Sequence, residues 1–116
     1  LRDSGGMDLC RVVVIDDNPA FLAAAGDLLA ADPRCEVVAL LSRPHGLPAL
    51  LHSVGVDVVV TDLVMPGFNG YQSTRLFKQC QPAPRVILVS LFDGPEFRAH
   101  AERSGADGYV AKEHLG

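Results

Sequence analysis

Five polar residues each stand at the end of an apolar run that is typical of a buried β-strand: Asp16, Asp17, Asp62, Ser90 and Lys112. Because the carboxyl ends of parallel strands meet at one edge of a sheet, we expect three carboxylates, a hydroxyl and an ammonium to converge there. Four separate strands that each deliver a polar residue to one edge are hard to explain by packing alone. The pattern therefore predicts a functional site at that edge.

Three crowded carboxylates repel one another unless a cation shares them, so a divalent metal is implied. An all-oxygen ligand set suits Mg²⁺ better than Zn²⁺, which prefers histidine or cysteine, and the four histidines lie away from these strand ends. A carboxylate beside Mg²⁺ can attack phosphorus while a lysine screens the remaining charge. The chemistry that these residue types favour is phosphoryl transfer to an aspartate.

The elements that must position these residues alternate between strand and helix. Apolar, β-branched runs predict strands over 11–15, 36–41, 56–61, 85–89 and 109–111. Helical patterns occupy 20–31, behind an Asn18 N-cap and Pro19, and then 46–54, 71–80 and 95–104, whereas the turn residues of 65–70 predict a loop. This alternation predicts right-handed βαβ units and a doubly wound α/β domain with a parallel five-stranded sheet.

The chain of 116 residues is long enough for one domain with one core. We expect residues 1–6, which precede the first methionine at Met7, to be a remnant or a disordered edge, and residues 7–116 to form the domain. A five-stranded doubly wound domain usually closes with a helix after its last strand, but only four residues follow Lys112. We therefore expect the last helix to be absent, either because the domain was cut there or because further residues follow Gly116.

Composition excludes several classes of protein. A hydrophobic fraction of 48% and a charged fraction of 21% are those of a soluble globular domain, and the apolar runs are too short to span a bilayer. A net charge of −4 argues against direct binding of nucleic acid, which requires a basic patch. The three cysteines form no CxxC pair, so we expect reduced, mostly buried thiols and a cytoplasmic location.

With these residues in place, the chain resembles the CheY-like receiver domains of bacterial two-component response regulators. The resemblance spans about Leu9 to Glu113 and rests on Asp16-Asp17, on DLVMPG at 62–67 with Gly70, on Ser90, and on GADGYVAK at 105–112. The spacings between these motifs fit the family as a set. The resemblance implies a flavodoxin-like (βα)5 fold with sheet order 2-1-3-4-5.

The resemblance also implies roles for individual residues. Asp62 is expected to be phosphorylated, Asp17 and Asp62 to bind Mg²⁺ directly, Asp16 to act through water, and the backbone carbonyl of Val64 to be the third protein ligand. Ser90 is expected to bond the phosphoryl oxygen and Lys112 to pair with its charge. Rotation of Tyr109 between outward and inward rotamers would accompany the movement of Ser90, so that both residues form the switch.

Two departures from the commonest family pattern refine the resemblance. Ser90 replaces the frequent threonine but keeps the hydroxyl, and Glu113 replaces the proline that often follows the lysine. Together they are similar to receivers joined to LuxR-type helix-turn-helix output domains. In a receiver, Val64 and Phe92 would flank the path of the water that hydrolyses the acyl phosphate. Two apolar side chains there predict a long-lived phosphoryl group.

The resemblance implies a sensor histidine kinase as phosphodonor and an output domain that controls transcription, while a homodimer is left open. The chain is not expected to be an enzyme beyond its own phosphotransfer and dephosphorylation. A phosphatase of the haloacid-dehalogenase kind would need an aspartate where Val64 stands, and a flavin or nucleotide binder would need an anion-binding loop at the acidic edge. A receiver that works as a protein-interaction module without phosphorylation remains the alternative.

Overall fold

Five parallel strands form the central sheet of the computed structural model, which describes residues 3–4 and 7–114. They are β3 (Cys10–Ile15), β4 (Cys35–Leu41), β5 (Val58–Asp62), β8 (Arg85–Ser90) and β9 (Gly108–Ala111). The strands lie in the order β4-β3-β5-β8-β9, and every neighbouring pair is parallel. Counted along the chain this order is 2-1-3-4-5, which confirms the predicted doubly wound sheet.

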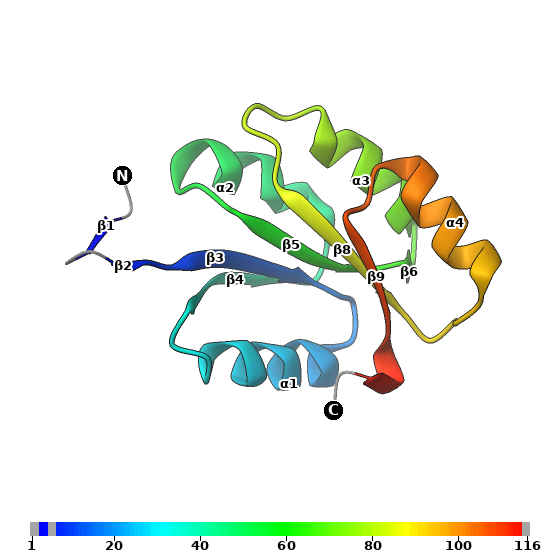
Figure 1. Cartoon of the computed structure of the whole chain (residues 1–116), viewed down its shortest axis with the longest axis horizontal. Helices are drawn as coiled ribbons and strands as arrows, with labels where there is room; N and C mark the ends of the chain where they lie inside the picture. Colours follow the sequence, from blue (N-terminus) through cyan, green and yellow to red (C-terminus); the bar gives the residue numbers. More distant parts are fainter. Residues whose placement is uncertain (1–2, 5–6, 115–116) are drawn as a thin grey trace.

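Helices cover both faces of the sheet: Figure 1 shows α1 on one face and α2, α3 and α4 on the other. Asn18 begins α1 as predicted, because its side chain accepts hydrogen bonds from the backbone amides of Ala20 and Phe21. The helix bounds are α1 (Pro19–Ala30), α2 (Leu47–Ser53), α3 (Gly70–Lys78) and α4 (Pro95–Ser104), with 3₁₀ turns η1 (Pro44–Gly46) and η2 (Lys112–His114).

The end of the chain bears on the prediction that the last helix is absent. In the part of the chain that the structure describes, β9 is followed only by the short turn η2. Residues 115–116 lie outside the described residues. None of the described helices is long and apolar enough to cross a lipid bilayer.

Two short hairpins were not predicted. The first pairs β1 (Asp3–Ser4) with β2 (Met7–Asp8), while residues 1–2 and 5–6 lie outside the described residues, so the prediction for residues 1–6 stays a prediction. The second pairs β6 (Val64–Met65) with β7 (Phe68–Asn69) inside the segment predicted to be a loop. Pro66 and Gly67 form its turn, and Gly67 has φ of 78°, a conformation that glycine adopts without strain.

The main core lies between the sheet and the helices α2 and α3. Alternate strand residues Val13, Ile15, Val59 and Val86 point to this face, and the apolar side chains Leu47, Leu51, Met65 and Phe77 close over them. A smaller cluster under α4 contains Leu63, Tyr71, Leu88 and Ala101. Because these residues must face the core, the register between neighbouring strands is fixed. The fixed register in turn aligns the carboxyl ends of the strands.

Two aspartates fasten the amino ends of the strands. Asp57 accepts a hydrogen bond of 2.8 Å from the backbone amide of Arg11, and Asp107 accepts one of 2.8 Å from that of Val86. Asp107 also binds the ammonium of Lys78 at 2.7 Å. Burial raises the pKa of Asp107, but the hydrogen bonds from Lys78 and Val86 and the nearby cations lower it overall. Lys78 therefore has a structural role at the edge opposite to the predicted site.

The cysteines correct one expectation from the sequence. Cys10, Cys35 and Cys80 form no disulfide, but all three are half-exposed and not buried. Cys10 and Cys35 are the first residues of the neighbouring strands β3 and β4, and their side chains remain partly accessible.

Candidate functional site

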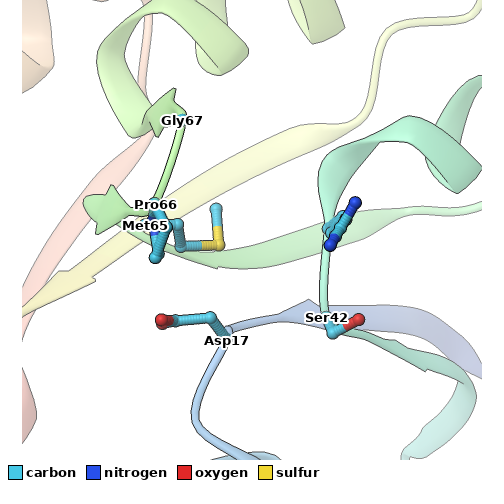
Figure 2. Close-up of a pocket in the computed structure, with 6 residues that line it drawn as sticks. Asp17, Ser42, Met65, Pro66 and Gly67 are labelled. Carbon is cyan, nitrogen blue, oxygen red and sulfur yellow. The ribbon is translucent and has the colours of Figure 1, made fainter.

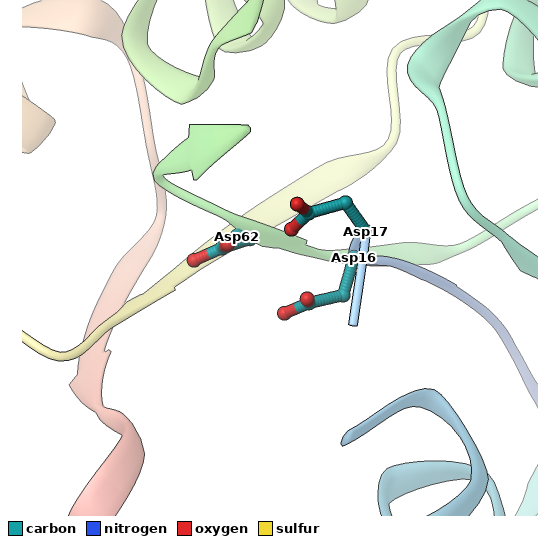
Figure 3. Close-up of side chains that lie close together, drawn as sticks. All are labelled: Asp16, Asp17 and Asp62. Atoms are coloured by element: carbon teal, nitrogen blue, oxygen red, sulfur yellow. The ribbon is translucent and has the colours of Figure 1, made fainter. Parts of the chain in front are cut away.

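Three carboxylates meet at the carboxyl ends of β3 and β5, as the sequence predicts (Figure 3). Asp16 and Asp17 directly follow β3, and Asp62 is the last residue of β5. Ile15 lies opposite Thr61 in the parallel register, so the two strands end side by side. One carboxylate oxygen from each residue lies within 4.8 Å of the others. Asp16 is fully buried and Asp62 nearly so, whereas Asp17 is exposed.

Asp16 is the buried member of the group and supplies an oxygen that lacks a hydrogen bond. Its Oδ1 accepts a hydrogen bond of 2.9 Å from the backbone amide of Asn18. Its Oδ2 is buried and makes no hydrogen bond of good geometry within the described residues, although the ammonium of Lys112 lies 2.9 Å away. A buried carboxylate oxygen of this kind fits a hydrated divalent cation, and the all-oxygen donor set fits Mg²⁺.

Lys112 reaches back from the end of β9 to both buried carboxylates. Its Nζ lies 2.9 Å from Asp16 Oδ2 and 3.5 Å from Asp62 Oδ1. The same ammonium lies 4.5 Å from the ring centre of Phe21 in α1, at the distance of a cation–π contact. Burial lowers the pKa of Lys112, but its bonds and charge interactions with Asp16 and Asp62 raise it overall. Lys112 is therefore held as a cation beside the acidic group.

Burial raises the pKa of Asp62, and the negative charges of Asp16 and Asp17 raise it further, while Lys112 opposes these effects. In the absence of a metal, the ionised form of Asp62 is thus disfavoured by its surroundings. A cation that binds between the three carboxylates would relieve this repulsion. The electrostatics and the geometry indicate the same kind of ligand.

Ser90 and Tyr109 share one partner, the main chain of Phe92. Ser90 is buried at the end of β8, and its Oγ accepts a hydrogen bond of 3.1 Å from the amide of Phe92. The hydroxyl of Tyr109 donates a hydrogen bond of 2.9 Å to the carbonyl of Phe92. The loop after β8 is therefore bonded to both residues that the sequence predicts to form a switch.

Arg98 in α4 holds Tyr109 from the other side and was missed by the sequence analysis. Its guanidinium lies 5.3 Å from the centre of the Tyr109 ring and donates a hydrogen bond of 3.1 Å to the Tyr109 carbonyl. It also pairs with Asp93 at 2.9 Å. No sequence signal marks this arginine, because its contacts depend on how α4 packs beside β9.

Gly70 sits where α3 meets the acceptor strand. A Cβ atom at this position would lie 2.8 Å from the Cα of Leu63 and 2.9 Å from the carbonyl oxygen of Asp62, which is too close for any side chain. The amide of Gly70 donates a hydrogen bond of 2.6 Å to the carbonyl of Leu63. From the sequence we expect this glycine to be a turn residue, whereas the structure shows a requirement for close packing.

An open pocket of about 440 Å³ adjoins the acidic group (Figure 2). Asp17 forms part of its wall, together with Ser42, Arg43, Met65, Pro66 and Gly67. The side chain of Val64, which precedes this wall in β6, is 58% exposed. The acidic group is thus accessible from solvent on the side of Asp17.

Comparison with known proteins places the chain in a family. The response regulator receiver domain matches residues 12–114, and the chain belongs to this family. It is 33% identical over 103 residues to the transcriptional regulatory protein DegU of Brevibacillus brevis. The aligned region covers 89% of this chain and 44% of DegU. It is 29% identical over 103 residues to the DNA-binding transcriptional activator EvgA of Escherichia coli K12. This aligned region covers 89% of this chain and 50% of EvgA.

Solved structures show the same fold. The signal receiver domain of the response regulator NarL from Mycobacterium tuberculosis superposes with a TM-score of 0.82 at 30% identity, over 90% of this chain and 85% of that one. A LuxR-family response regulator from Aurantimonas superposes with a TM-score of 0.82 at 30% identity, over 90% and 75% of the two chains. The predicted receiver fold and the similarity to LuxR-family receivers are confirmed. The chain spans half or less of the length of DegU and EvgA.

Proposed function

We propose that the chain accepts a phosphoryl group on Asp62. The observation that carries this proposal is the position of Asp62, which lies within 4.8 Å of two further carboxylates and 3.5 Å from the ammonium of Lys112. A free carboxylate oxygen of Asp62 attacks the phosphorus of a donor, and the donor's leaving group departs on the opposite side. An acyl phosphate on Asp62 results.

Mg²⁺ is the proposed cofactor, held directly by Asp17, Asp62 and the backbone carbonyl of Val64, with Asp16 acting through water. When bound, it neutralises charge on the transferring phosphoryl oxygens. The ammonium of Lys112 pairs with a further phosphoryl oxygen. This new ion pair replaces part of its present ion pair with Asp16. Phe21 keeps the ammonium close to the site during this exchange.

The proposed switch follows from the residue that Ser90 and Tyr109 share, Phe92, whose amide and carbonyl they bond. When the Ser90 hydroxyl turns toward a phosphoryl oxygen, its Oγ no longer accepts the hydrogen bond from the Phe92 amide. The loop then moves, and the bond between the Tyr109 hydroxyl and the Phe92 carbonyl is strained or broken. Tyr109 is thereby released to rotate inward, which changes the surface formed by α4 and β9.

The wider role rests on the relatives. We propose that a sensor histidine kinase is the natural donor in the cytoplasm, and that the switched surface controls a LuxR-type DNA-binding output domain and so transcription. DegU and EvgA carry the corresponding names as transcriptional regulators. In this proposal the domain itself acts as a regulatory phosphoacceptor and does not bind nucleic acid, and a homodimer is left open.

The proposal is tested by incubating the purified chain with Mg²⁺ and acetyl phosphate and recording the intact mass and the tryptic peptides. We expect a mass gain of one phosphoryl group on the peptide that contains Asp62. The gain is expected to vanish in Asp62→Asn and when Mg²⁺ is removed with EDTA. If the wild type gains no phosphoryl group and shows no Mg²⁺-dependent binding of beryllofluoride, the phosphorylation-independent interaction module is the better description.

A long lifetime of the acyl phosphate is the finer part of the proposal. The side chains of Val64 and Phe92 are 58% and 51% exposed, and neither offers a polar atom that could position an attacking water. We expect the phosphoryl group on the purified domain to persist for much longer than seconds, and Val64→Asn or Phe92→Gln to shorten its lifetime. Loss of the label from the wild type within seconds would contradict this expectation.

A further inference from the structure

Cys10 and Cys35 are far apart in the sequence but adjacent in the fold. Cys10 is the first residue of β3 and Cys35 the first residue of β4. The two residues are direct partners in the parallel register of these strands. The amide of Cys10 donates a hydrogen bond of 2.8 Å to the carbonyl of Arg34, which fixes the pairing at this end of the sheet.

The register allows a covalent link between the two side chains. Partner residues on neighbouring strands project from the same face, and the strands lie about 4.8 Å apart, within the range of about 4.4–6.8 Å between the Cα atoms of disulfides. Both residues are the first of their strands, so the strand pairing continues only on their carboxyl side. The small approach that a sulfur–sulfur bond requires is therefore local.

Both thiols are accessible, and the third cysteine provides a contrast. Cys10, Cys35 and Cys80 are all half-exposed. Cys80 follows α3 and packs against the main core. Its thiol donates a hydrogen bond of 3.7 Å to the backbone carbonyl of Leu76. It has no cysteine as a strand partner among the described residues. All three cysteines are therefore partly exposed, but only Cys10 and Cys35 are strand partners of each other among the described residues.

We propose that Cys10 and Cys35 form a reversible dithiol–disulfide pair whose oxidant is a low-molecular-weight disulfide. The thiolate of one cysteine attacks the small disulfide, forms a mixed disulfide and releases one small thiolate. The thiolate of the other cysteine then attacks the protein sulfur and releases the second small thiolate. Two electrons pass to the small molecule, and the two protons from the protein thiols appear on the two released thiols.

The link would fasten the edge strand β4 to β3 and close a loop that contains the whole of α1. Such a cross-link restricts the unfolded chain, so the oxidised form is expected to unfold at a higher temperature. Asp16 lies six residues beyond Cys10 in an extended strand, a separation of about 20 Å. We therefore expect oxidation to leave the binding of metal at the acidic group unchanged.

The test uses the whole chain, incubated with excess oxidised glutathione and then alkylated with iodoacetamide. We expect a tryptic product that joins the Cys10 and Cys35 peptides, with Cys80 outside it and carrying either an alkyl group or glutathione. Cleavage after Arg11, Arg34 and Lys78 places the three cysteines on separate peptides. Cys80→Ser is the matched control and is expected to form the same product. Cys10→Ser and Cys35→Ser are each expected to stop at a mixed disulfide.

A parallel incubation in urea separates the effect of the fold from that of the chain. We expect the equilibrium constant for closing the disulfide to be at least ten-fold larger in the folded protein than in the unfolded one. Equal or smaller values in the folded protein, stable glutathione adducts on both Cys10 and Cys35, or a disulfide that joins Cys80 to either of them would each overturn the proposal. These outcomes do not depend on phosphorylation of Asp62.

Discussion

Removing the charge of Asp62 is expected to stabilise the metal-free protein. In Asp62→Asn, the amide oxygen can still accept a hydrogen bond from Lys112, and the amide NH₂ group can donate to a neighbouring carboxylate. The substitution therefore keeps the shape and the ammonium contact, and removes the repulsion by Asp16 and Asp17. The raised pKa of Asp62, caused first by burial and then by Asp16, indicates the same direction.

The magnitude follows from the distances in the site. At an effective dielectric constant of about 20, each carboxylate oxygen 4.8 Å away costs about 3.5 kcal/mol, and the ammonium 3.5 Å away contributes about 4.7 kcal/mol. The exposure of Asp17 weakens its repulsion, whereas the burial of Asp62 adds a desolvation cost. We expect Asp62→Asn to raise the free energy of unfolding by about 1–2 kcal/mol, which corresponds to a rise in Tm of about 5–10 °C.

The assay is thermal and urea unfolding in EDTA, followed by circular dichroism. Asp27→Asn is the matched control, because Asp27 is exposed on α1, and we expect it to change stability by less than about 0.5 kcal/mol. Added Mg²⁺ is then expected to raise the Tm of the wild type more than that of Asp62→Asn, because only the wild type offers the full set of ligands. If Asp62→Asn unfolds in EDTA at the same temperature as the wild type or below it, the electrostatic reasoning is wrong.

Three further predictions concern the surroundings of the site. Gly70→Ala is expected to destabilise the fold by about 1–3 kcal/mol in urea, whereas Gly46→Ala, whose Cβ would meet its neighbours at 3.7 Å, is expected to be tolerated. Arg98→Ala is expected to increase the population of other rotamers of the Tyr109 ring about two- to five-fold, because the ring loses its cation–π contact. NMR of labelled tyrosine would measure this change, and unchanged Tyr109 resonances would contradict it. The lowered pKa of Asp107 means that its carboxylate stabilises the fold above the unfolded-state pKa, and that this stability is lost as the pH falls through the lower folded-state pKa. In Asp107→Asn, the urea midpoint is therefore expected to depend less on pH below about 4, and an unchanged pH dependence would contradict the assignment.

The sequence predicts the strand ends well because they depend on local patterns. An apolar run followed by an acidic residue identifies Asp16, Asp17 and Asp62, and the order of strands and helices determines that these residues share one edge. The start of α1 is equally local, since an Asn-Pro pair signals an N-cap. For features of this kind, the residue and its neighbours in the chain carry the information.

Most of the contacts that the sequence did not predict join distant segments. Phe21 beneath the Lys112 ammonium and Arg98 beside Tyr109 depend on how a helix packs against a strand far away in the chain. The adjacency of Cys10 and Cys35 depends on the register between two strands, which no single motif encodes. The hairpin after Asp62 was not predicted because Pro66 and Gly67 indicate a turn but do not indicate that the residues on either side of it pair as strands.

The hydroxyls of Ser90 and Tyr109 both bond to residue 92, and on residue 92 only main-chain groups take part. The amide and the carbonyl of residue 92 are present whatever side chain it carries, apart from proline, so the side chain can change without removing either bond. In this protein the side chain is a phenylalanine that stacks on Phe97, with ring centres 5.2 Å apart, on the outer surface of the domain. Under the proposed switch, the path of the signal and the surface that receives it would therefore be free to evolve independently. Proline at position 92, which has no amide hydrogen, would remove the bond to Ser90.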